Sequence, residues 1–447
     1  MSLALALLMA ASPAPPLSLH ATATTLDNGL TVIISEDHSI PGVAMDVLYE
    51  VGSKDEEPGR TGFAHLYEHL MFMGARYVPY PRFDTIMEAA GGTNNASTSN
   101  DFTWYHESGP SNLLETFCWM EADRMATFGL EMTDEKLSTQ KPVVLNERRQ
   151  NYEARPYGTA DLVTHEQAWP EGHPYHHTPI GSARDIEAAQ LDDVKRFFAR
   201  WYVPSNAIVS IVGDVDTAQA QALVKQYFGW IPSPKKPEHP PAPPLPQRAQ
   251  TEVRRLTDKV ELPKLILAWT SPPYMKPGDS ECDVLATVLA HGKASRLYKR
   301  LVHEKKIATE VAAAQASHSQ GSVFEIEVMG LPGKDLAEIQ KEVDAVVQEL
   351  IAKGPTPAEL EAARNVIIGG IARELEGLTS RAHLLSVLQA NYGDPNTLHK
   401  ELARYTTLTP KAVAEVGRKY LGVGKLVVEV RPEPASADDA SKAGGSR

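Results

Sequence analysis

The 447-residue sequence contains few cysteines and has a deficit of basic charge. Its two cysteines, Cys118 and Cys282, are too few for a disulfide framework or a thiolate zinc site, so we expect two buried free thiols. The 44 Lys and Arg residues are outnumbered by 57 Asp and Glu residues, and the net charge is −13. No basic stripe and no Walker A loop are present, so we expect neither nucleic-acid binding nor P-loop chemistry.

Long apolar runs are also missing, and no stretch is long enough to span a bilayer. A short apolar run at residues 3–11 precedes a Pro-rich stretch and Ala21-Thr22-Ala23. This order resembles the apolar core and cleavage site of a secretory signal, although no Lys or Arg comes before the run. We interpret residues 1–24 as a possible leader and expect a periplasmic or secreted protein, with a cytoplasmic protein as the alternative.

The chain is too long for one ordinary core, so we expect two or more domains. Nearly every second residue between 232 and 246 is proline, which excludes a helix or central strand and favours an extended linker. We predict a first domain at 25–231, a linker at 232–248 and a second domain at 249–432. Residues 433–447, rich in Ala, Ser, Gly and Asp, are predicted to be a disordered tail.

The predicted helices and strands follow a similar order in the two domains. For the first domain the patterns predict a hairpin of strands at 30–34 and 43–51, helices at about 62–73, 110–128 and 191–201, a helix starting at Thr133, and a strand at 207–212. For the second they predict strands at 265–269 and 323–328 and helices at 280–305, 335–353 and about 357–376. We interpret this order as a duplicated α+β unit.

The strongest chemical signal is His65-Leu66-Tyr67-Glu68-His69, in an apolar helical stretch. On a helix, residues four apart lie about 40° apart around the axis, so His65 and His69 project from one face. Each offers an imidazole nitrogen to one ion, and Glu68 lies close to both. Two ligands and a carboxylate suit hydrolysis, because a catalytic zinc takes three protein ligands and leaves one position for water.

The third metal ligand must come from another element, and residue type alone leaves Glu131, Glu135, Glu147 and Glu153 open. The alternative interpretation of the motif is a pair of helix-surface histidines with a local polar contact. In a chain with this composition the full motif arises by chance only about 0.03 times. We therefore predict a Zn²⁺ site in which the motif's glutamate takes a proton from water and passes it to the leaving amine.

The sequence resembles the inverzincin peptidases of the insulinase, pitrilysin and mitochondrial processing peptidase group. The resemblance covers about residues 25–432 and is carried by an ordered set of segments at 26–30, 59–72, 91–96, 174–175, 201–207, 212–214 and 295–298. It implies an α+β fold of two homologous α/β-roll domains, each with an antiparallel-rich sheet covered by helices. Such a chain forms half of a clamshell that closes around a peptide.

The resemblance also implies roles for individual residues. His65 and His69 match the zinc ligands, Glu68 matches the general base, and Glu147, at the end of segment 143–147, matches the third ligand. Pro142 lies in the helix that bears this ligand, so a kink is expected.

Two further positions take their roles from the same resemblance. Asn95 and Ala96 match an edge strand whose backbone pairs with an extended substrate. Gln140 stands seven residues before the third ligand, where the family usually has an acid that supports catalysis.

The second half departs from the family in an informative way. The resemblance implies an Arg and, seven residues later, a Tyr that hold the substrate carbonyl, but this chain has Val302 and Thr309 there. Our hypothesis is a heterodimer in which a homologous subunit supplies the Arg and the Tyr, and a weakly active homodimer is the alternative. The expected function is a zinc endopeptidase acting on peptides in a closed chamber. The alternative function is a non-catalytic scaffold of the same family.

Overall fold

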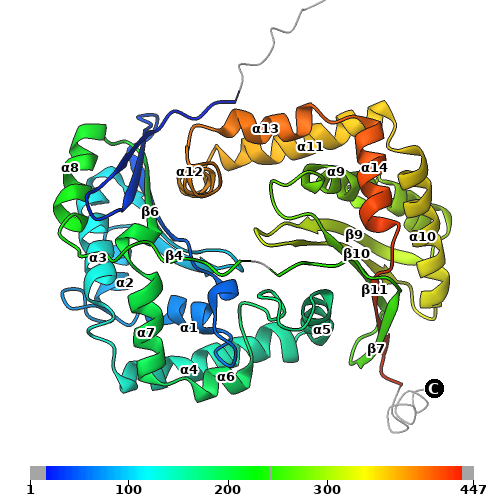
Figure 1. The fold of residues 1–447 in the computed structure, drawn as a ribbon, viewed down its shortest axis with the longest axis horizontal. Coiled ribbons are helices and arrows are strands. Elements are labelled where there is room, and N and C mark those ends of the chain that lie inside the picture. Colours follow the sequence, from blue (N-terminus) through cyan, green and yellow to red (C-terminus); the bar gives the residue numbers. More distant parts are fainter. Residues whose placement is uncertain (1–16, 242, 435–447) are drawn as a thin grey trace, which may run out of the picture.

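The computed structural model describes residues 17–241 and 243–434, which form two sheets, each covered by helices (Figure 1). The apolar run at 3–11 and the tail from 435 onwards lie outside the described residues. The predicted leader reaches to residue 24, but Thr22–Thr25 form strand β1 at the edge of the first sheet. Among the described residues, no helix has the length and apolar character to cross a membrane.

The first domain contains a six-stranded sheet in the order β1-β2-β6-β3-β5-β4. Its remaining strands are β2 (Thr31–Glu36), β3 (Gly42–Tyr49), β4 (Thr93–Thr98), β5 (Thr103–Pro110) and β6 (Ala207–Gly213). Its helices are α1 (Phe63–Leu70), α2 (Arg82–Ala89), α3 (Leu114–Thr127), α4 (Asp134–Arg148), α5 (Gly158–Ala168), α6 (Ala183–Ala188), α7 (Leu191–Trp201) and α8 (Thr217–Phe228).

The predicted hairpin of β2 and β3 is wrong, because β6 lies between them. β6 pairs with β2 in parallel and with β3 antiparallel. All seven residues of β6 are buried. A strand buried on both faces is stable only in the interior of a sheet, and this requirement overrides the adjacency of β2 and β3 in sequence.

The second domain repeats this topology with the strand order β7-β11-β8-β10-β9. As in the first domain, one parallel pair, β7 with β11, is followed by antiparallel pairs. Its strands are β7 (Glu252–Asp258), β8 (Lys264–Ser271), β9 (Ala308–Ala316), β10 (Ser322–Gly330) and β11 (Leu426–Pro432). Its helices are α9 (Asp279–Ala290), α10 (Leu336–Lys353), α11 (Pro357–Glu374), α12 (Leu378–Tyr392), α13 (Leu398–Thr406) and α14 (Pro410–Leu421). The predicted duplication is therefore confirmed.

The single helix predicted at 280–305 is wrong. α9 ends at Ala290, and Gly292 follows with a φ of 73°. Glycine adopts this left-handed conformation without a steric penalty, and it commonly follows a helix end. The chain then forms a separate π-helical segment, Tyr298–Glu304.

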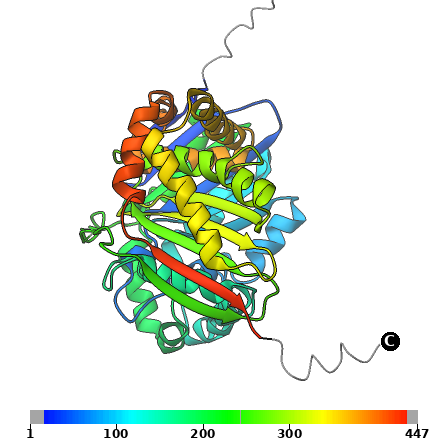
Figure 2. The ribbon, with the colours of Figure 1, turned by 90° about the vertical axis from the view of Figure 1, so that its right-hand side faces the viewer.

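Each sheet has one face covered by helices of its own domain. In the second domain, α10 and α14 cross this face (Figure 2), and Val343 and Val413 pack in a core with Leu267 of β8. In the first domain, Leu66 of α1 and Phe117 of α3 belong to the corresponding core. The motif at residues 65–69 is therefore carried by a helix that is anchored on the sheet.

The other face of each sheet is covered by a helix from the opposite half of the sequence (Figure 1). α12 places Leu385 in a buried cluster with Ile33 and Ile208 of the first sheet. α5 places Ala160 in a cluster with Ile266 and Val428 of the second sheet. The two domains have exchanged helices, so each completes the core of the other.

The described residues of the Pro-rich segment, 232–241 and 243–248, form no helix or strand apart from one isolated bridge between Arg248 and Gly424. This extended form agrees with the proline content. Cys118 and Cys282 are buried free thiols, as predicted.

Candidate metal centre

Helix α1 is shorter than predicted, and its start is fixed by a buried carboxylate. Glu56 accepts hydrogen bonds from the backbone amides of Gly62 (2.8 Å) and Ala64 (2.7 Å), so two of the unpaired donors at the helix N-terminus are satisfied. Gly62 has a φ of 90°, and an added Cβ would lie 2.6 Å from the side chain of Ile186. Glycine is therefore required where the chain turns into the helix.

The burial of α1 follows its sequence pattern. Phe63, Leu66, Tyr67 and Leu70 are almost completely buried in the first core. The remaining face carries the two histidines and the glutamate of the motif. Packing of the apolar residues therefore fixes the direction in which the motif points.

Three side chains converge beside α1. Nε2 of His69 lies 3.0 Å from Oε2 of Glu147, and Nε2 of His65 lies 3.6 Å from Oε1 of the same carboxylate. The two imidazole rings are 4.8 Å apart and nearly perpendicular. Within the described part of the chain, these residues form the one group of three or more His, Cys, Asp or Glu side chains arranged closely enough to hold a metal ion.

The separations suit a zinc ion. Zinc binds imidazole nitrogen at about 2.0–2.1 Å and carboxylate oxygen at about 2.0–2.2 Å, which puts neighbouring ligands of a tetrahedron roughly 3.3 Å apart. The two distances to Glu147 lie on either side of this value. Two histidines and one glutamate also form a known catalytic zinc set with one open position.

The local environment keeps the side chains of His65 and Glu147 in the forms that bind metal. Burial, together with the neighbouring His69, lowers the pKa of His65 to about 4, so its imidazole is neutral. The hydrogen bond with His69 lowers the pKa of Glu147, which favours its carboxylate. Asn151 donates to Oε1 of Glu147 (3.3 Å), a contact that the sequence did not predict. A neutral imidazole and an ionised carboxylate are the forms that coordinate zinc.

Glu68 projects from the same helix but has a different partner. The hydroxyl of Thr98, at the end of β4, donates to its Oε2 at 2.6 Å. Burial raises the pKa of Glu68, while this hydrogen bond acts in the opposite direction. A carboxylate with a raised pKa is a suitable proton acceptor near neutral pH.

Of the four candidate glutamates, the structure brings Glu147 to the histidines. Glu131 pairs with Arg76, Glu153 pairs with Arg148, and Glu135 is exposed in the first turn of α4. Helix α4 passes through Pro142 and continues to Arg148. The proline therefore does not end the helix before it presents its carboxylate.

Gln140 does not hydrogen-bond to the proposed metal ligands, as a residue that supports catalysis would. Its Nε2 donates to the sulfur of Met73 (2.7 Å), and among the described residues it makes no hydrogen bond to Glu147 or to the motif. An amide in place of an acid removes the charge that would act on the metal ligands.

Asn95 and Ala96 lie on β4, the outermost strand of the first sheet. Asn95 is exposed, and its side-chain oxygen accepts a hydrogen bond from the amide of Ala96 (2.8 Å). β4 pairs with β5 along one edge and is the last strand in the sheet order. The predicted edge strand is thus present, and it lies beside helix α1, since its Thr98 bonds to Glu68.

In the second half, the two positions at which the family has substrate-holding residues have different side chains in this chain. Val302 lies in the π-helical segment and packs against the second core. Thr309 is exposed on β9, and its hydroxyl donates to the carbonyl of Met329 (3.3 Å). Neither side chain supplies a cation or a phenol.

Comparison with known proteins gives matches over most of the chain. The family model described as Insulinase (Peptidase family M16) matches residues 31–175, and the model described as Peptidase M16 inactive domain matches residues 188–367. Zinc protease PqqE of Helicobacter pylori is 32% identical over 346 residues, which cover 75% of this chain and 76% of that protein.

Solved structures show the same fold. A protease from Helicobacter pylori aligns with a TM-score of 0.86 and 28% identity over 93% of this chain and all of that one. The periplasmic protease PqqL from Escherichia coli aligns with a TM-score of 0.74 and 18% identity, over 95% of this chain but 49% of that one. The family matches, the related zinc protease and the two-domain fold confirm the resemblance seen in the sequence: the chain belongs to the insulinase family of peptidases, peptidase family M16.

Proposed function

We propose that this chain is the zinc-bearing subunit of an endopeptidase, with His65, His69 and Glu147 as metal ligands and Glu68 as general base. The observation that carries the proposal is the convergence of two imidazoles and one carboxylate from α1 and α4 within 4.8 Å of one another. These three side chains would hold the metal beside the face of α1 that does not pack in the core. The related proteins described as zinc proteases support the choice of metal.

The chemistry follows from this arrangement. Zinc, when bound, lowers the pKa of a coordinated water and polarises the scissile carbonyl. Glu68 takes a proton from the attacking water as the water oxygen bonds to the carbonyl carbon. It then gives this proton to the amine nitrogen, which leaves when the carbon–nitrogen bond breaks. The Thr98 hydroxyl occupies one oxygen of this carboxylate, which leaves the other for the water.

The edge strand β4 is the proposed binding place for the peptide. An extended segment that pairs with its free edge would be aligned by backbone hydrogen bonds, with Asn95 and Ala96 among the pairing residues. Backbone pairing does not depend on side-chain identity, so the substrates would be short or unfolded peptides rather than one sequence. A closed chamber would restrict access to such peptides.

A homologous partner subunit is part of the proposal. The chain aligns with 49% of PqqL, and the first half of that protease has this fold, so one such unit makes up about half of this relative. Val302 and Thr309 leave this chain without an Arg and a Tyr to hold the substrate carbonyl, and a partner would supply them. We place the complex in the periplasm or outside the cell, on the basis of the apolar run at 3–11.

A non-catalytic scaffold is the second candidate. Gln140, Val302 and Thr309 favour it, as does the match of the second half to the model described as an inactive domain. Comparison of the wild-type chain with Glu68→Gln separates the two. For an enzyme, both proteins bind one zinc per chain and only the wild type hydrolyses an unstructured fluorogenic peptide. Equal peptide hydrolysis by both proteins, or no zinc binding, would refute the proposed function.

The subunit composition has its own test. The purified chain with zinc should hydrolyse the peptide slowly, and addition of a homologous chain that carries the Arg and the Tyr should raise the rate about 100-fold or more, a typical effect of donors that hold a reacting carbonyl. Full activity of the chain alone would contradict the heterodimer.

A further inference from the structure

Thr98 is the one hydrogen-bond donor to the Glu68 carboxylate among the described residues. A glutamate side chain has three rotatable bonds, so a base that must meet one water needs a partner that holds its carboxylate in place. The donor–acceptor distance of 2.6 Å is typical of a hydroxyl bonded to an ionised carboxylate.

The position of Thr98 depends on the turn that follows it. Thr98 pairs with Thr103 at the end of the β4–β5 ladder, and residues 99–102 connect the strands. Inside this turn, Ser99 and Phe102 are joined by hydrogen bonds between backbone groups (2.8 Å) and between the Ser99 hydroxyl and the Phe102 amide (3.0 Å). The ends of the turn are therefore bonded to each other, so a shift at one end is passed to the other.

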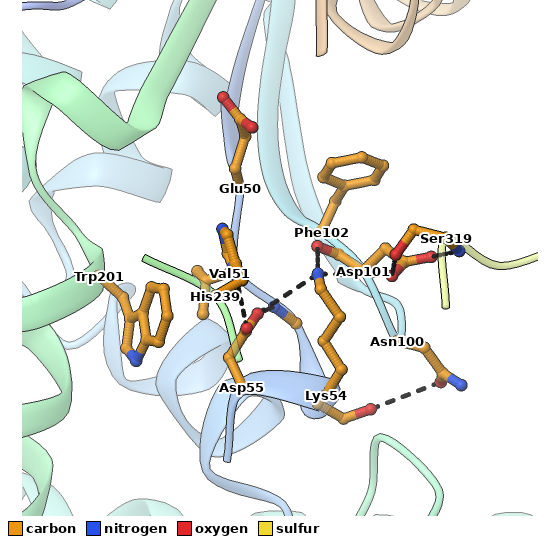
Figure 3. Close-up of polar contacts among 12 residues, drawn as sticks. Glu50, Val51, Lys54, Asp55, Asn100, Asp101, Phe102, Trp201, His239 and Ser319 are labelled. Atoms are coloured by element: carbon orange, nitrogen blue, oxygen red, sulfur yellow. Dashed lines mark hydrogen bonds and ion pairs between the residues drawn. The ribbon is translucent and has the colours of Figure 1, made fainter. Parts of the chain in front are cut away.

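The first domain holds one side of this turn. The Lys54 amide donates to the Asn100 carbonyl (3.1 Å), and the Lys54 ammonium donates to the Asp101 carbonyl (2.8 Å). The same ammonium lies 3.4 Å from both the Asp101 and the Asp55 carboxylates, as Figure 3 shows. Asp55 in turn contacts His239 of the Pro-rich segment (2.6 Å).

The second domain holds the other side. Ser319, between β9 and β10, donates to the Asp101 carboxylate from its amide (2.9 Å) and its hydroxyl (2.5 Å), and Figure 3 shows the two side chains facing each other. Tyr175, which belongs to the first domain, donates to the same carboxylate (2.7 Å). Asp101 is only 7% exposed, so these donors replace water around a buried charge. Loss of one of them would shift the turn.

We propose that Thr98 is a positioning residue for Glu68 and that the contact between Asp101 and Ser319 makes this positioning depend on docking of the second domain. The inference rests on the proposed function, because it assumes that Glu68 is the general base. The second domain lacks a metal site of its own among its described residues. It would nevertheless act on the reaction, through a chain of contacts that runs from Ser319 to Asp101, Thr98 and the base.

The first experiment compares Thr98→Val with Thr98→Ser in the zinc-loaded chain, with its partner subunit if turnover requires it. We expect Thr98→Val to lower kcat about 10- to 100-fold, the range seen when a supporting partner of a metal site is removed, with KM and zinc content unchanged. Thr98→Ser keeps the hydroxyl and should stay within about threefold of the wild type. Thr85→Val is the matched control, because within the described part of the chain the Thr85 hydroxyl bonds only to the Pro81 carbonyl of its own helix start.

The second experiment tests the link to the second domain. Ser319→Ala removes one donor to Asp101 and should lower kcat about three- to tenfold without loss of zinc. If Ser319 acts through Thr98, the same substitution should cause no further loss in the Thr98→Val background, because contacts in one network are not additive. Independent, multiplying losses would overturn the proposed link.

The outcomes separate this inference from the function on which it rests. The inference is overturned if Thr98→Val has the same kcat as Thr85→Val. It is also overturned if the loss of kcat comes with a loss of zinc, or if Thr98→Ser does not restore kcat. In each of these cases the proposed function stands as long as Glu68→Gln abolishes hydrolysis. If Glu68→Gln hydrolyses the peptide as fast as the wild type, the proposed function fails and the inference fails with it.

Discussion

The carboxylate of Glu56 accepts a hydrogen bond from the backbone amide of Ala64, at 2.7 Å, one residue before the first histidine of the zinc motif. A second bond reaches Gly62, and the Glu56 side chain is completely buried. The direction of α1, and with it the direction of both imidazoles, therefore depends on a residue that does not touch the metal centre.

Replacement of Glu56 by Ala should weaken both the fold and the metal centre. Two buried amide donors lose their acceptor, so we expect the free energy of unfolding to fall by about 2–4 kcal/mol. Zinc affinity should fall about tenfold, because the helix start is free to move. Denaturant unfolding and zinc competition measure the two effects. Glu57→Ala, at the exposed neighbouring position, should change neither quantity, and equal effects of both substitutions would contradict the assigned role of Glu56.

Removal of zinc should abolish peptide hydrolysis and lower the thermal stability. With free zinc about 1,000-fold above its Kd, the bound ion stabilises the folded chain by about 4 kcal/mol. Glu147→Gln should bind zinc poorly and show little of this stabilisation. Glu153→Gln, whose side chain is half exposed and pairs with Arg148, should behave as the wild type. Metal analysis and melting curves with and without a chelator test this, and zinc binding that survives Glu147→Gln would exclude it as a ligand.

The pH dependence of stability should show the titration of Asp283. Burial, with the neighbouring Asp279, raises the pKa of Asp283 to about 7 in the folded chain, against about 4 when unfolded. The folded state therefore keeps a proton that the unfolded state releases between these values. It follows that the contribution of Asp283 to the free energy of unfolding should decrease as pH rises from about 4 to about 7, by up to about 4 kcal/mol, and then level off.

Asp283→Asn supplies the matched control for this titration. The amide keeps the size of the side chain and a possible contact with the Tyr405 hydroxyl, which lies 2.9 Å from Asp283. The difference in unfolding free energy between wild type and variant should therefore grow with pH over this window. A difference that is constant from pH 4 to 8 would show that Asp283 does not titrate there.

The exchange of α5 and α12 predicts that the two domains unfold together. Leu385→Ala in α12 leaves a cavity against Ile33 and Ile208 of the first sheet and should lower the free energy of unfolding by about 2–5 kcal/mol. Circular dichroism and tryptophan fluorescence should give one coincident denaturant transition for wild type and variant. Leu130→Ala, at a side chain that is 69% exposed, should have an effect within about 0.5 kcal/mol. Two separate transitions in the wild type would disprove the coupling.

Local patterns in the sequence were enough to predict the motif's helix face, the linker and the duplication. The spacing of His65, Glu68 and His69 fixed their common helix face, because a helix repeats every 3.6 residues whatever surrounds it. Proline in the segment between the domains excluded regular structure there, and the repeated order of strands and helices showed the duplication. The resemblance to the family selected Glu147 from four glutamates that residue type alone left equal.

Tertiary structure decided the rest. Only the folded chain shows that Glu147 meets the histidines, that Gln140 turns to Met73, and that Thr98 bonds to Glu68. The insertion of β6 between β2 and β3 and the exchange of helices were likewise absent from any local pattern. The reason is physical: periodicity specifies which face of an element is apolar, whereas the partner of that face is chosen by long-range burial and hydrogen bonding.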